Sequence, residues 1–291
     1  MISLVIHQLL ITYCVIIRGN HLINQVEYFF TGYGPVDWGK VSQNCDKSAQ
    51  SPINIETSSL IKAPNGKGLK LTCDNSGYVS GKIVNNGHAP TLNIDKTKGT
   101  CRLSGGPLGN SKYKLQQFHF HFGCKDDEGS EHTVDGDAYS GELHLVTYNT
   151  KYRDFATAAD KTDGLSVIGV FLQEEDDDDD DSNYSLRRLA KAMRRIRDKD
   201  QQFQVNGLSL FDLVAQLRDL SGSSFYSYKG SLTTPPCYQS VSWIVLEEAI
   251  SARKKELDAM RGLRNHEKQP MCGNFRPPKP INGRTVSEFS G

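Results

Sequence analysis

The sequence predicts a single α+β domain built on a large, twisted, mainly antiparallel sheet with peripheral helices. Many short segments are rich in β-branched, aromatic and alternating apolar residues, as strands are, whereas only two stretches show the spacing of an amphipathic helix. Clusters of glycine and asparagine separate the strand-like segments, as turns require. Many strands and few helices favour a sheet that carries its helices at the periphery.

The expected elements follow one another along the whole chain. The strand-like segments are residues 53–55, 69–71, 91–94, 113–115, 117–122, 142–146, 165–171 and 241–246. Helical spacing is shown by Leu186, Leu189, Met193 and Ile196 and, after Ser251 as an expected cap, by Leu257, Met260 and Leu263. A length of 291 residues allows one or two domains, so the choice between them depends on the motifs.

Two of the strand-like segments, 117–122 and 142–146, carry three histidines. Side chains alternate along a strand, so His119 and His121 share one face while the phenylalanines between them take the other. His144 lies on the second segment, in a face that is otherwise mostly apolar. The same faces carry the candidate supporting groups Gln117 and Glu142.

The three histidines indicate a metal site. A single strand histidine is more often an ordinary residue than a metal ligand, but His-x-His with a third histidine on a neighbouring segment reverses that preference. Three neutral imidazoles suit a tetrahedral zinc whose fourth position stays open, whereas a closed structural site uses four protein ligands, usually with cysteine. The sequence therefore predicts a catalytic Zn²⁺ ion held by His119, His121 and His144.

Further motifs accompany the histidines in a consistent order. They are Gln50-Ser51-Pro52-Ile53-Asn54-Ile55, Asn85-Asn86-Gly87-His88, Gly129-Ser130-Glu131-His132-Thr133-Val134, Gly230-Ser231-Leu232-Thr233-Thr234-Pro235-Pro236 and Asn274-Phe275-Arg276-Pro277. With these motifs the chain resembles the α-class carbonic anhydrases of the secreted type. The resemblance implies one catalytic domain over residues 28–289 and a twisted sheet of about ten strands.

The resemblance also implies a reaction, the reversible hydration of carbon dioxide to bicarbonate and a proton by attack of zinc-bound hydroxide. Carbonic anhydrases are themselves the type example of a zinc site that prepares hydroxide near neutral pH. Thr233 and Glu131 would orient the nucleophile, and His88 would carry the proton away. Substrate would be bound by Thr233, Thr234, Val146, Val167, Leu232 and Trp243.

The same resemblance assigns supporting roles around the metal and the water path. Gln117 would orient His119, Glu142 would orient His144, and the backbone carbonyl of Asn274 would orient His121. The water path would be lined by Tyr33, Asn86 and Gln117.

The cysteines favour an oxidising compartment. Of seven, Cys14 lies in the N-terminal apolar run, so six remain in the domain, an even number that permits complete pairing. The resemblance implies a disulfide between Cys45 and Cys237. The pairing of the other four stays open, and buried free thiols are an equal alternative for Cys73, Cys101, Cys124 and Cys272.

Residues 1–20 are interpreted as a signal peptide of a secreted protein. Residues 2–17 are mostly apolar and are followed by Arg18, although His7 and Gln8 interrupt the run. The alternative is a retained N-terminal signal anchor, for which the run is slightly short. The C-terminal residues lack the apolar tail of a lipid anchor or a membrane span, so no C-terminal membrane anchor is expected.

An acidic insertion over residues 174–183 stands apart in composition. Glu174 and Glu175 precede an unbroken run from Asp176 to Asp181, which is expected to form a solvated surface loop. Its functional alternative is a weak contact with calcium or a carbonate mineral through Asp176 to Asp181, because calcium prefers carboxylate oxygens. Asn183 begins an Asn-Tyr-Ser glycosylation sequon beside it.

Two other classes of function compete with catalysis on carbon dioxide. A carbonic anhydrase-like matrix protein would use the acidic run in a biomineralising setting and need no activity, but such a protein would be expected to lack a zinc histidine. A general zinc hydrolase is the other alternative, although the chain has no His-Glu-x-x-His arrangement. The formal net charge is zero, so composition gives no support for nucleic-acid binding.

Overall fold

The computed structural model describes residues 34–63, 68–175 and 183–290. The expected signal peptide, Tyr33 and the run from Asp176 to Asp181 lie outside these residues. The described part of the chain contains no helix that is both long and apolar enough to cross a membrane.

One large sheet dominates the molecule and confirms the predicted class. It has 13 strands, and its main path runs β11-β4-β5-β7-β9-β10-β13-β12-β15-β2, with β14 beside β10 and the β3–β6 pair attached through β7. The main path has ten strands, the number that the resemblance implies, and β3, β6 and β14 are additional strands beside it. Most neighbours are antiparallel, but β13 and β14 both pair with β10 in parallel, so the sheet is mixed. Two further short strands, β1 and β8, form a small parallel pair.

The strands are bounded as follows. They are β1 Asn54–Ile55, β2 Ile61–Lys62, β3 Lys70–Cys73, β4 Tyr78–Asn85, β5 Pro90–Ile94, β6 Cys101–Ser104, β7 Lys112–Phe122, β8 Thr133–Val134, β9 Gly141–Asn149, β10 Leu165–Glu175, β11 Gln202–Ser209, β12 Phe225–Gly230, β13 Val241–Leu246, β14 Ile250–Arg253 and β15 Ser287–Phe289. The two segments expected at 113–115 and 117–122 are one continuous strand, β7.

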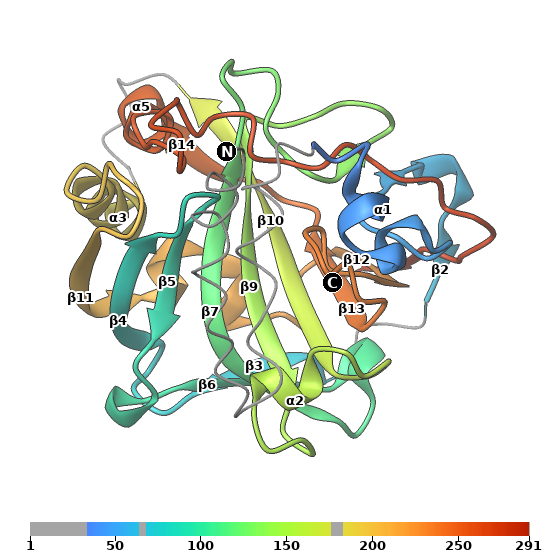
Figure 1. Cartoon of the computed structure of the whole chain (residues 1–291). Coiled ribbons are helices and arrows are strands. Elements are labelled where there is room, and N and C mark those ends of the chain that lie inside the picture. The colour runs from blue at the N-terminus through green and yellow to red at the C-terminus, as the bar shows by residue number, and fades with distance from the viewer. Residues whose placement is uncertain (1–33, 64–67, 176–182, 291) are drawn as a thin grey trace, which may run out of the picture.

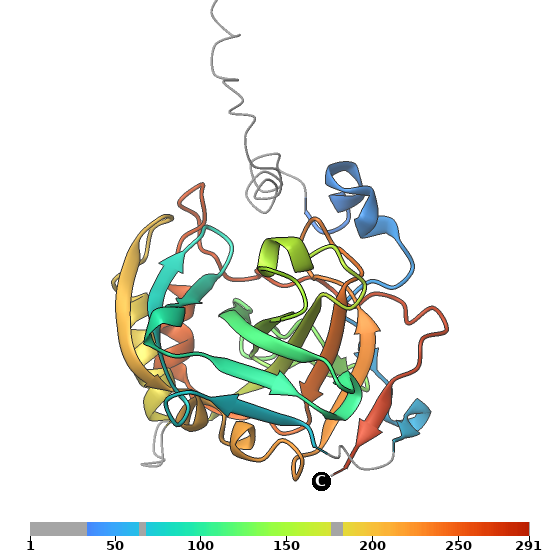
Figure 2. The ribbon, with the colours of Figure 1, turned by 90° about the horizontal axis from the view of Figure 1, so that it is seen from below.

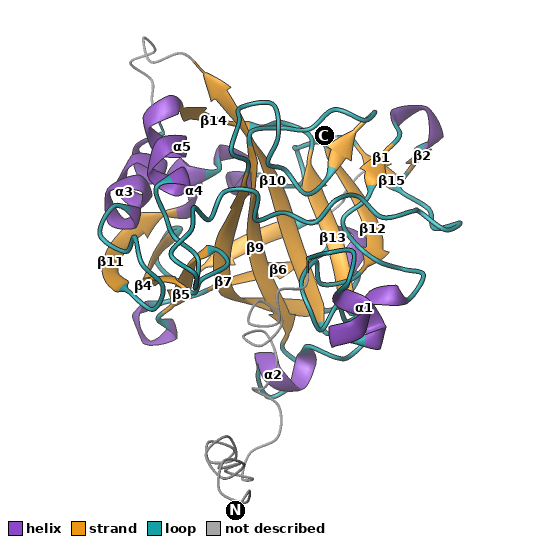
Figure 3. Ribbon diagram, turned by 45° about the horizontal axis from the view of Figure 1, so that its top comes forward, coloured by secondary structure: helices purple, strands orange, loops and turns teal. Residues whose placement is uncertain are grey.

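Helices are few and lie at the periphery, as Figure 3 shows by colour. The α-helices are α1 Trp38–Val41, α2 Phe155–Ala158, α3 Tyr184–Met193, α4 Leu210–Leu213 and α5 Lys254–Arg261, and short 3-10 turns lie in the connecting segments. In Figure 1, β7, β9 and β10 run side by side through the middle of the molecule, with α3 and α5 on one side and α1 on the other. Seen from below, the outer strands turn out of the plane of the central ones, so the sheet is strongly twisted (Figure 2).

The start of α5 differs from the expectation that Ser251 caps it. Ser251 lies in β14, where it pairs with Gln173 of β10, and the helix begins only after the strand ends. The N-terminal turn is completed by Glu256, whose carboxylate accepts a hydrogen bond from the Arg253 backbone N–H at 3.0 Å. In this position Glu256 satisfies the backbone N–H of the residue that precedes the helix, which is the part that an acidic third residue plays in a capping box.

The two faces of the sheet bury separate apolar clusters. Phe118, Phe120 and Phe122 point from β7 into the larger cluster, which includes the apolar faces of α3 and α5. The opposite face carries a smaller cluster with Val146, Val167 and Trp243. The alternation in β7 therefore fixes its histidines on the face opposite its phenylalanines.

All six cysteines within the described residues are paired. Disulfides join Cys45 to Cys237, Cys73 to Cys101, and Cys124 to Cys272. The structure thus resolves the pairing that composition left open for the last four, and it contains none of them as a free thiol.

Candidate metal centre

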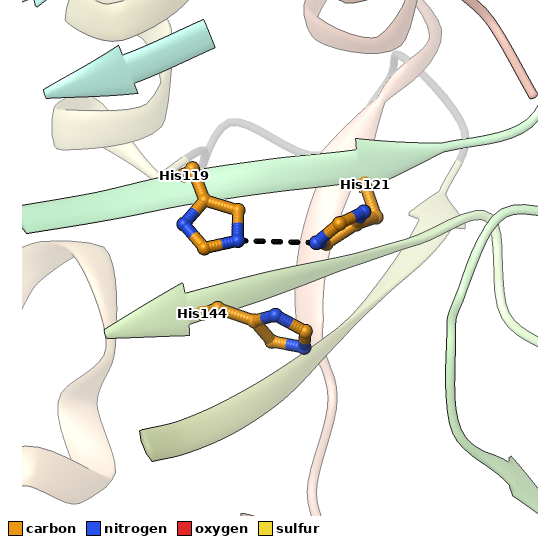
Figure 4. A group of neighbouring side chains, drawn as sticks. All are labelled: His119, His121 and His144. Carbon is orange, nitrogen blue, oxygen red and sulfur yellow. Dashed lines mark hydrogen bonds between the residues drawn. The ribbon is translucent and has the colours of Figure 1, made fainter. Parts of the chain in front are cut away.

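The three histidines meet because β7 and β9 pair in an antiparallel register that sets His119 directly opposite His144. His121 follows two residues later on the same face of β7. Figure 4 shows the three rings gathered between the two strands. The Nε2 atoms of His119 and His121 are 3.1 Å apart. One ring nitrogen from each of the three histidines can be chosen so that all three nitrogens lie within 4.8 Å of one another.

The outer nitrogen of each ring faces an acceptor. His119 Nδ1 lies 3.0 Å from Gln117 Oε1, His121 Nδ1 lies 2.7 Å from the Asn274 carbonyl, and His144 Nε2 lies 2.8 Å from Glu142 Oε1. A carbonyl or carboxylate oxygen only accepts, so each outer nitrogen carries the proton and donates it. The three inner nitrogens then turn lone pairs toward one another.

A fourth acceptor reinforces this concentration of lone pairs. Glu131 is fully buried, and its Oε2 atom has no hydrogen-bond partner among the residues that the structure describes. It lies 3.4 Å from His121 Nε2 and 3.8 Å from His144 Nδ1. Buried acceptors without a donor are costly, and a cation among them removes that cost. The residues present therefore fit a zinc ion, with the open three-histidine donor set of a catalytic site.

The electrostatic environment keeps two of the rings in the neutral form that binds metal. Burial, followed by the neighbouring imidazoles, lowers the pKa of His119 well below its ordinary value. Burial likewise lowers the pKa of His121. For His144, burial acts in the same direction, but the Glu142 carboxylate outweighs it and raises the pKa.

Glu142 belongs to a buried hydrogen-bonded chain as well as to the metal centre. Its Oε1 atom lies 2.7 Å from His132 Nδ1, and His132 Nε2 lies 2.7 Å from the Tyr228 hydroxyl. Its Oε2 atom accepts hydrogen bonds from the backbone N–H groups of Glu131 and His132 at 2.9 and 2.8 Å. The His132, Glu142 and His144 group is thus explained by hydrogen bonds without a second metal.

The three histidines line a cavity of about 300 Å³. One wall is apolar, because β9, β10 and β13 set Val146, Val167 and Trp243 in a single row, each opposite the next. Leu232 completes that wall, and Thr233 and Thr234 also line the cavity. The other wall is polar and includes Asn86, His88 and Gln117. Predicted residues from six different parts of the sequence therefore share one cavity.

A family model for eukaryotic-type carbonic anhydrases matches residues 33–290. The chain belongs to this family. Among its relatives is mouse (Mus musculus) carbonic anhydrase 7, 39% identical over 258 residues that cover 87% of this chain and 93% of that protein. Mouse carbonic anhydrase 1 is 37% identical and bovine (Bos taurus) carbonic anhydrase 3 is 36% identical, each with 87% of this chain and 94% of the relative covered.

The family assignment confirms the expected enzyme class, a carbonic anhydrase and hence a lyase. Thr233 lines the cavity, and the Oε2 atom of Glu131 has no hydrogen-bond partner among the described residues. One oxygen of Glu131 accepts from the Arg276 backbone N–H at 2.9 Å, and the other faces the histidines.

His88 lies in the cavity wall of this carbonic anhydrase on a turn built by Asn86. The Asn86 Oδ1 atom accepts from the backbone N–H groups of His88 and Ala89, both at 2.8 Å. The His88 ring is half-buried beside His266, with ring centroids 6.5 Å apart. Burial, with smaller contributions from the charges of His266 and Lys199, lowers the pKa of His88 to about 3.

Sequence reasoning missed several cavity residues. Phe155, Asn93, Gln116 and Val84 line the same space, although no catalytic pattern marks them in the sequence. His266 was missed as the neighbour of His88 because 178 positions separate the two in the chain (266 − 88). The two segments are joined by Asn85, three residues before His88, whose Nδ2 atom donates to the carbonyl of Arg264, two residues before His266, at 3.0 Å.

Proposed function

We propose that this protein is a zinc-dependent carbonic anhydrase that reversibly converts carbon dioxide and water into bicarbonate and a proton. The observation that carries the proposal is the convergence of three histidine lone pairs, each fixed by an acceptor behind the ring, in a cavity that an apolar row of side chains also lines. Zinc, when bound there, would supply an acidified water as the nucleophile, a chemistry for which carbonic anhydrases are the type example.

The chain's own residues would do the remaining work. Carbon dioxide carries no net charge, so the row of Val146, Val167 and Trp243 would bind it by contact and exclude competing water. Thr233 and Thr234 at the cavity wall would offer polar groups to the substrate and to bicarbonate. Glu131, whose Oε2 atom faces the histidines, would accept a hydrogen bond from a neighbouring hydroxyl and so orient the attack.

The purified protein should contain one zinc per chain and accelerate carbon dioxide hydration. Zinc content by atomic absorption and the rate of pH change after mixing with carbon dioxide check the two parts. Stoichiometric zinc without hydration would favour the matrix-protein alternative instead. A protein that binds no zinc would contradict the proposed centre.

We propose that His88 carries the proton from the cavity to solvent, helped by the polar wall. A group with a pKa of about 3 accepts protons poorly near neutral pH. We therefore expect His88→Ala to lower turnover at low buffer concentration by less than the ~100-fold that a well-tuned general base supplies. Zinc should stay bound, and added imidazole buffer should restore the rate, as measured by stopped-flow hydration across buffer concentrations. Identical rates for parent and variant at every buffer concentration would remove His88 from this role.

We propose that the acidic run is peripheral to catalysis and serves mineral or calcium contact. Its attachment point, Glu175, ends β10 six residues beyond Gly169, which pairs with the candidate ligand His144 (175 − 169). At ~3.3 Å per residue this separation is about 20 Å. Charges that far away are screened, because the Debye length is about 10 Å at moderate ionic strength.

Replacing residues 176–181 with a Gly/Ser linker should therefore leave zinc content and hydration rate unchanged. The same change should lower calcium-dependent adsorption to calcium carbonate, measured by depletion of protein from solution. A replacement with equal numbers of glutamates is the matched control, since it keeps the charge. Loss of hydration in the linker variant would contradict a peripheral position, and unchanged adsorption would contradict the mineral contact.

We propose that the protein is exported through its N-terminal apolar segment. Support comes from the three disulfides, because such bonds persist in oxidising compartments and are rare in the cytosol. Expression in a secreting host should yield a protein in the medium whose N-terminus lies near residue 20. Protein that stays with the membrane fraction and keeps residue 1 would favour the signal-anchor alternative.

A further inference from the structure

The segment that follows α5 reaches the metal centre without forming a helix or strand. From Met271 to Pro280 it has no regular secondary structure, yet it supplies the carbonyl of Asn274 that accepts from His121 Nδ1 at 2.7 Å. The orientation of one candidate zinc ligand therefore depends on where an irregular piece of backbone lies. The contacts that fix this backbone become part of the metal centre.

The side chain of Asn274 accepts a hydrogen bond from the backbone at the end of β7 and donates another to it. Its Oδ1 atom accepts from the Phe122 backbone N–H at 2.8 Å, and its Nδ2 atom donates to the Phe120 carbonyl at 3.0 Å. The backbone N–H of Gly273 adds a hydrogen bond to the Phe122 carbonyl at 2.9 Å. These bonds bracket His121, which lies between Phe120 and Phe122 on the same strand.

The Cys124–Cys272 disulfide links the same two segments, the end of β7 and the segment that carries Asn274, by a covalent bond. Cys124 lies two residues after Phe122, and Cys272 lies two residues before Asn274. A covalent bond thus joins the two backbones next to the hydrogen bonds that hold Asn274 beside His121.

The Cys124 end of the disulfide is itself firmly held. The Arg261 side chain, at the end of α5, donates to the carbonyls of Gly123 and Lys125 at 3.0 and 2.8 Å, on both sides of Cys124. It also forms an ion pair with Asp126 at 2.6 Å. Because Cys124 is fixed to a helix, the disulfide fixes Cys272 and, through it, the approach of Asn274.

We propose that the Cys124–Cys272 disulfide is a positioning element of the metal centre, which holds the Asn274 carbonyl against His121 and so slows the loss of zinc. This inference rests on the proposed function, in which the three histidines bind zinc. Loss of a group that orients a metal ligand typically costs 10- to 100-fold in metal affinity. The disulfide does not contact His121 itself but holds the segment of Asn274, which does, so we expect an effect at the lower end of this range, about 10-fold.

The other two disulfides provide the contrast. Cys73–Cys101 joins neighbouring positions of β3 and β6, a pair attached to the side of the sheet, and neither strand lines the cavity. Cys45 and Cys237 are both buried, whereas Cys124 is exposed to solvent. Only the Cys124–Cys272 bond stands beside the group that orients a candidate ligand.

The test compares two double variants, Cys124→Ala/Cys272→Ala and the matched control Cys73→Ala/Cys101→Ala. Each is loaded with one zinc, and the rate of zinc release to excess dipicolinate is measured well below its unfolding temperature. We expect release about 10-fold faster than the parent for the first and within about 2-fold for the control. Cobalt substitution gives a second measurement, since a changed visible spectrum reports altered ligand geometry whatever the activity.

A third variant covers the case in which loss of the disulfide prevents folding. Arg261→Ala keeps the disulfide but removes the contacts on both sides of Cys124, and we expect faster release in the same direction. If the Cys124 and Cys272 variant, or Arg261→Ala in its place, releases zinc no faster than the control and keeps the parent's cobalt spectrum, the inference is wrong. A parent protein that binds no zinc would instead contradict the proposed function, so the two failures are distinguishable.

Discussion

The His144→Ala variant is expected to lose zinc and, with it, all measurable hydration of carbon dioxide. The variant keeps only His119 and His121, whose Nε2 atoms are 3.1 Å apart, and two imidazoles do not fix an open tetrahedral site. His144 is also the candidate ligand that Glu142 orients, so after its removal the Glu142 carboxylate has no ligand of the site to orient. This is the largest loss of activity expected from any single substitution considered.

The protein should nevertheless fold, because Glu142 keeps other partners. Its carboxylate still accepts from the backbone N–H groups of Glu131 and His132 and still faces the His132 ring. A buried charge that stays paired avoids the heavy cost of an unpaired one, so we expect a stability loss of about 1–3 kcal/mol. Circular dichroism and thermal unfolding check the fold, and atomic absorption and stopped-flow hydration check the site.

His266→Ala is the matched control, since it removes a histidine near the cavity that is not among the three candidate ligands. It should retain one zinc per chain. If His144→Ala retained stoichiometric zinc and full hydration, the assignment of the third ligand would have to be abandoned.

The histidine faces could be predicted from sequence because they depend only on local geometry. The period of two in β7 and β9 places His119, His121 and His144 with Gln117 and Glu142, whatever the rest of the chain does. The Asn274 contact is different, since 153 positions separate Asn274 from His121 and the contact is made by a backbone carbonyl. Only the resemblance to a known family indicated it.

Several strands were missed because their residues carry a weak local signal. The edge strand β11 is mostly exposed, so it lacks the apolar alternation that marks a half-buried strand. Strand β4 contains Gly81, which reads as a turn residue. A Cβ atom at Gly81 would lie 2.0 Å from the Asn93 carbonyl oxygen, so the glycine is needed for the close approach of β5. That requirement is visible only when both strands are in place.

Removal of the Cys45–Cys237 disulfide is expected to cause the largest loss of stability. The two cysteines are 192 positions apart, and the chain-entropy model gives about 5 kcal/mol for a loop of that length. Both residues are buried beside Trp38, so Cys45→Ala/Cys237→Ala also leaves unfilled space in that cluster. The expected result is a free energy of unfolding about 5 kcal/mol lower, measured by urea denaturation.

The Cys73→Ala/Cys101→Ala variant supplies the comparison, because its disulfide spans only 28 positions. The same model gives about 3.5 kcal/mol for it, so the two variants should differ by about 1.5 kcal/mol. The longer bridge also lies close to the cavity: Cys237 is four positions after Thr233 (237 − 233), and its carbonyl accepts from Gln50 Nε2 at 3.3 Å. Hydration should therefore fall in the Cys45 and Cys237 variant under conditions where it is still folded, while the control keeps the parent rate. Equal stability losses in the two variants would show that the long bridge does not constrain the unfolded chain more than the short one does. Full hydration in both variants would show that it does not constrain the Thr233 loop.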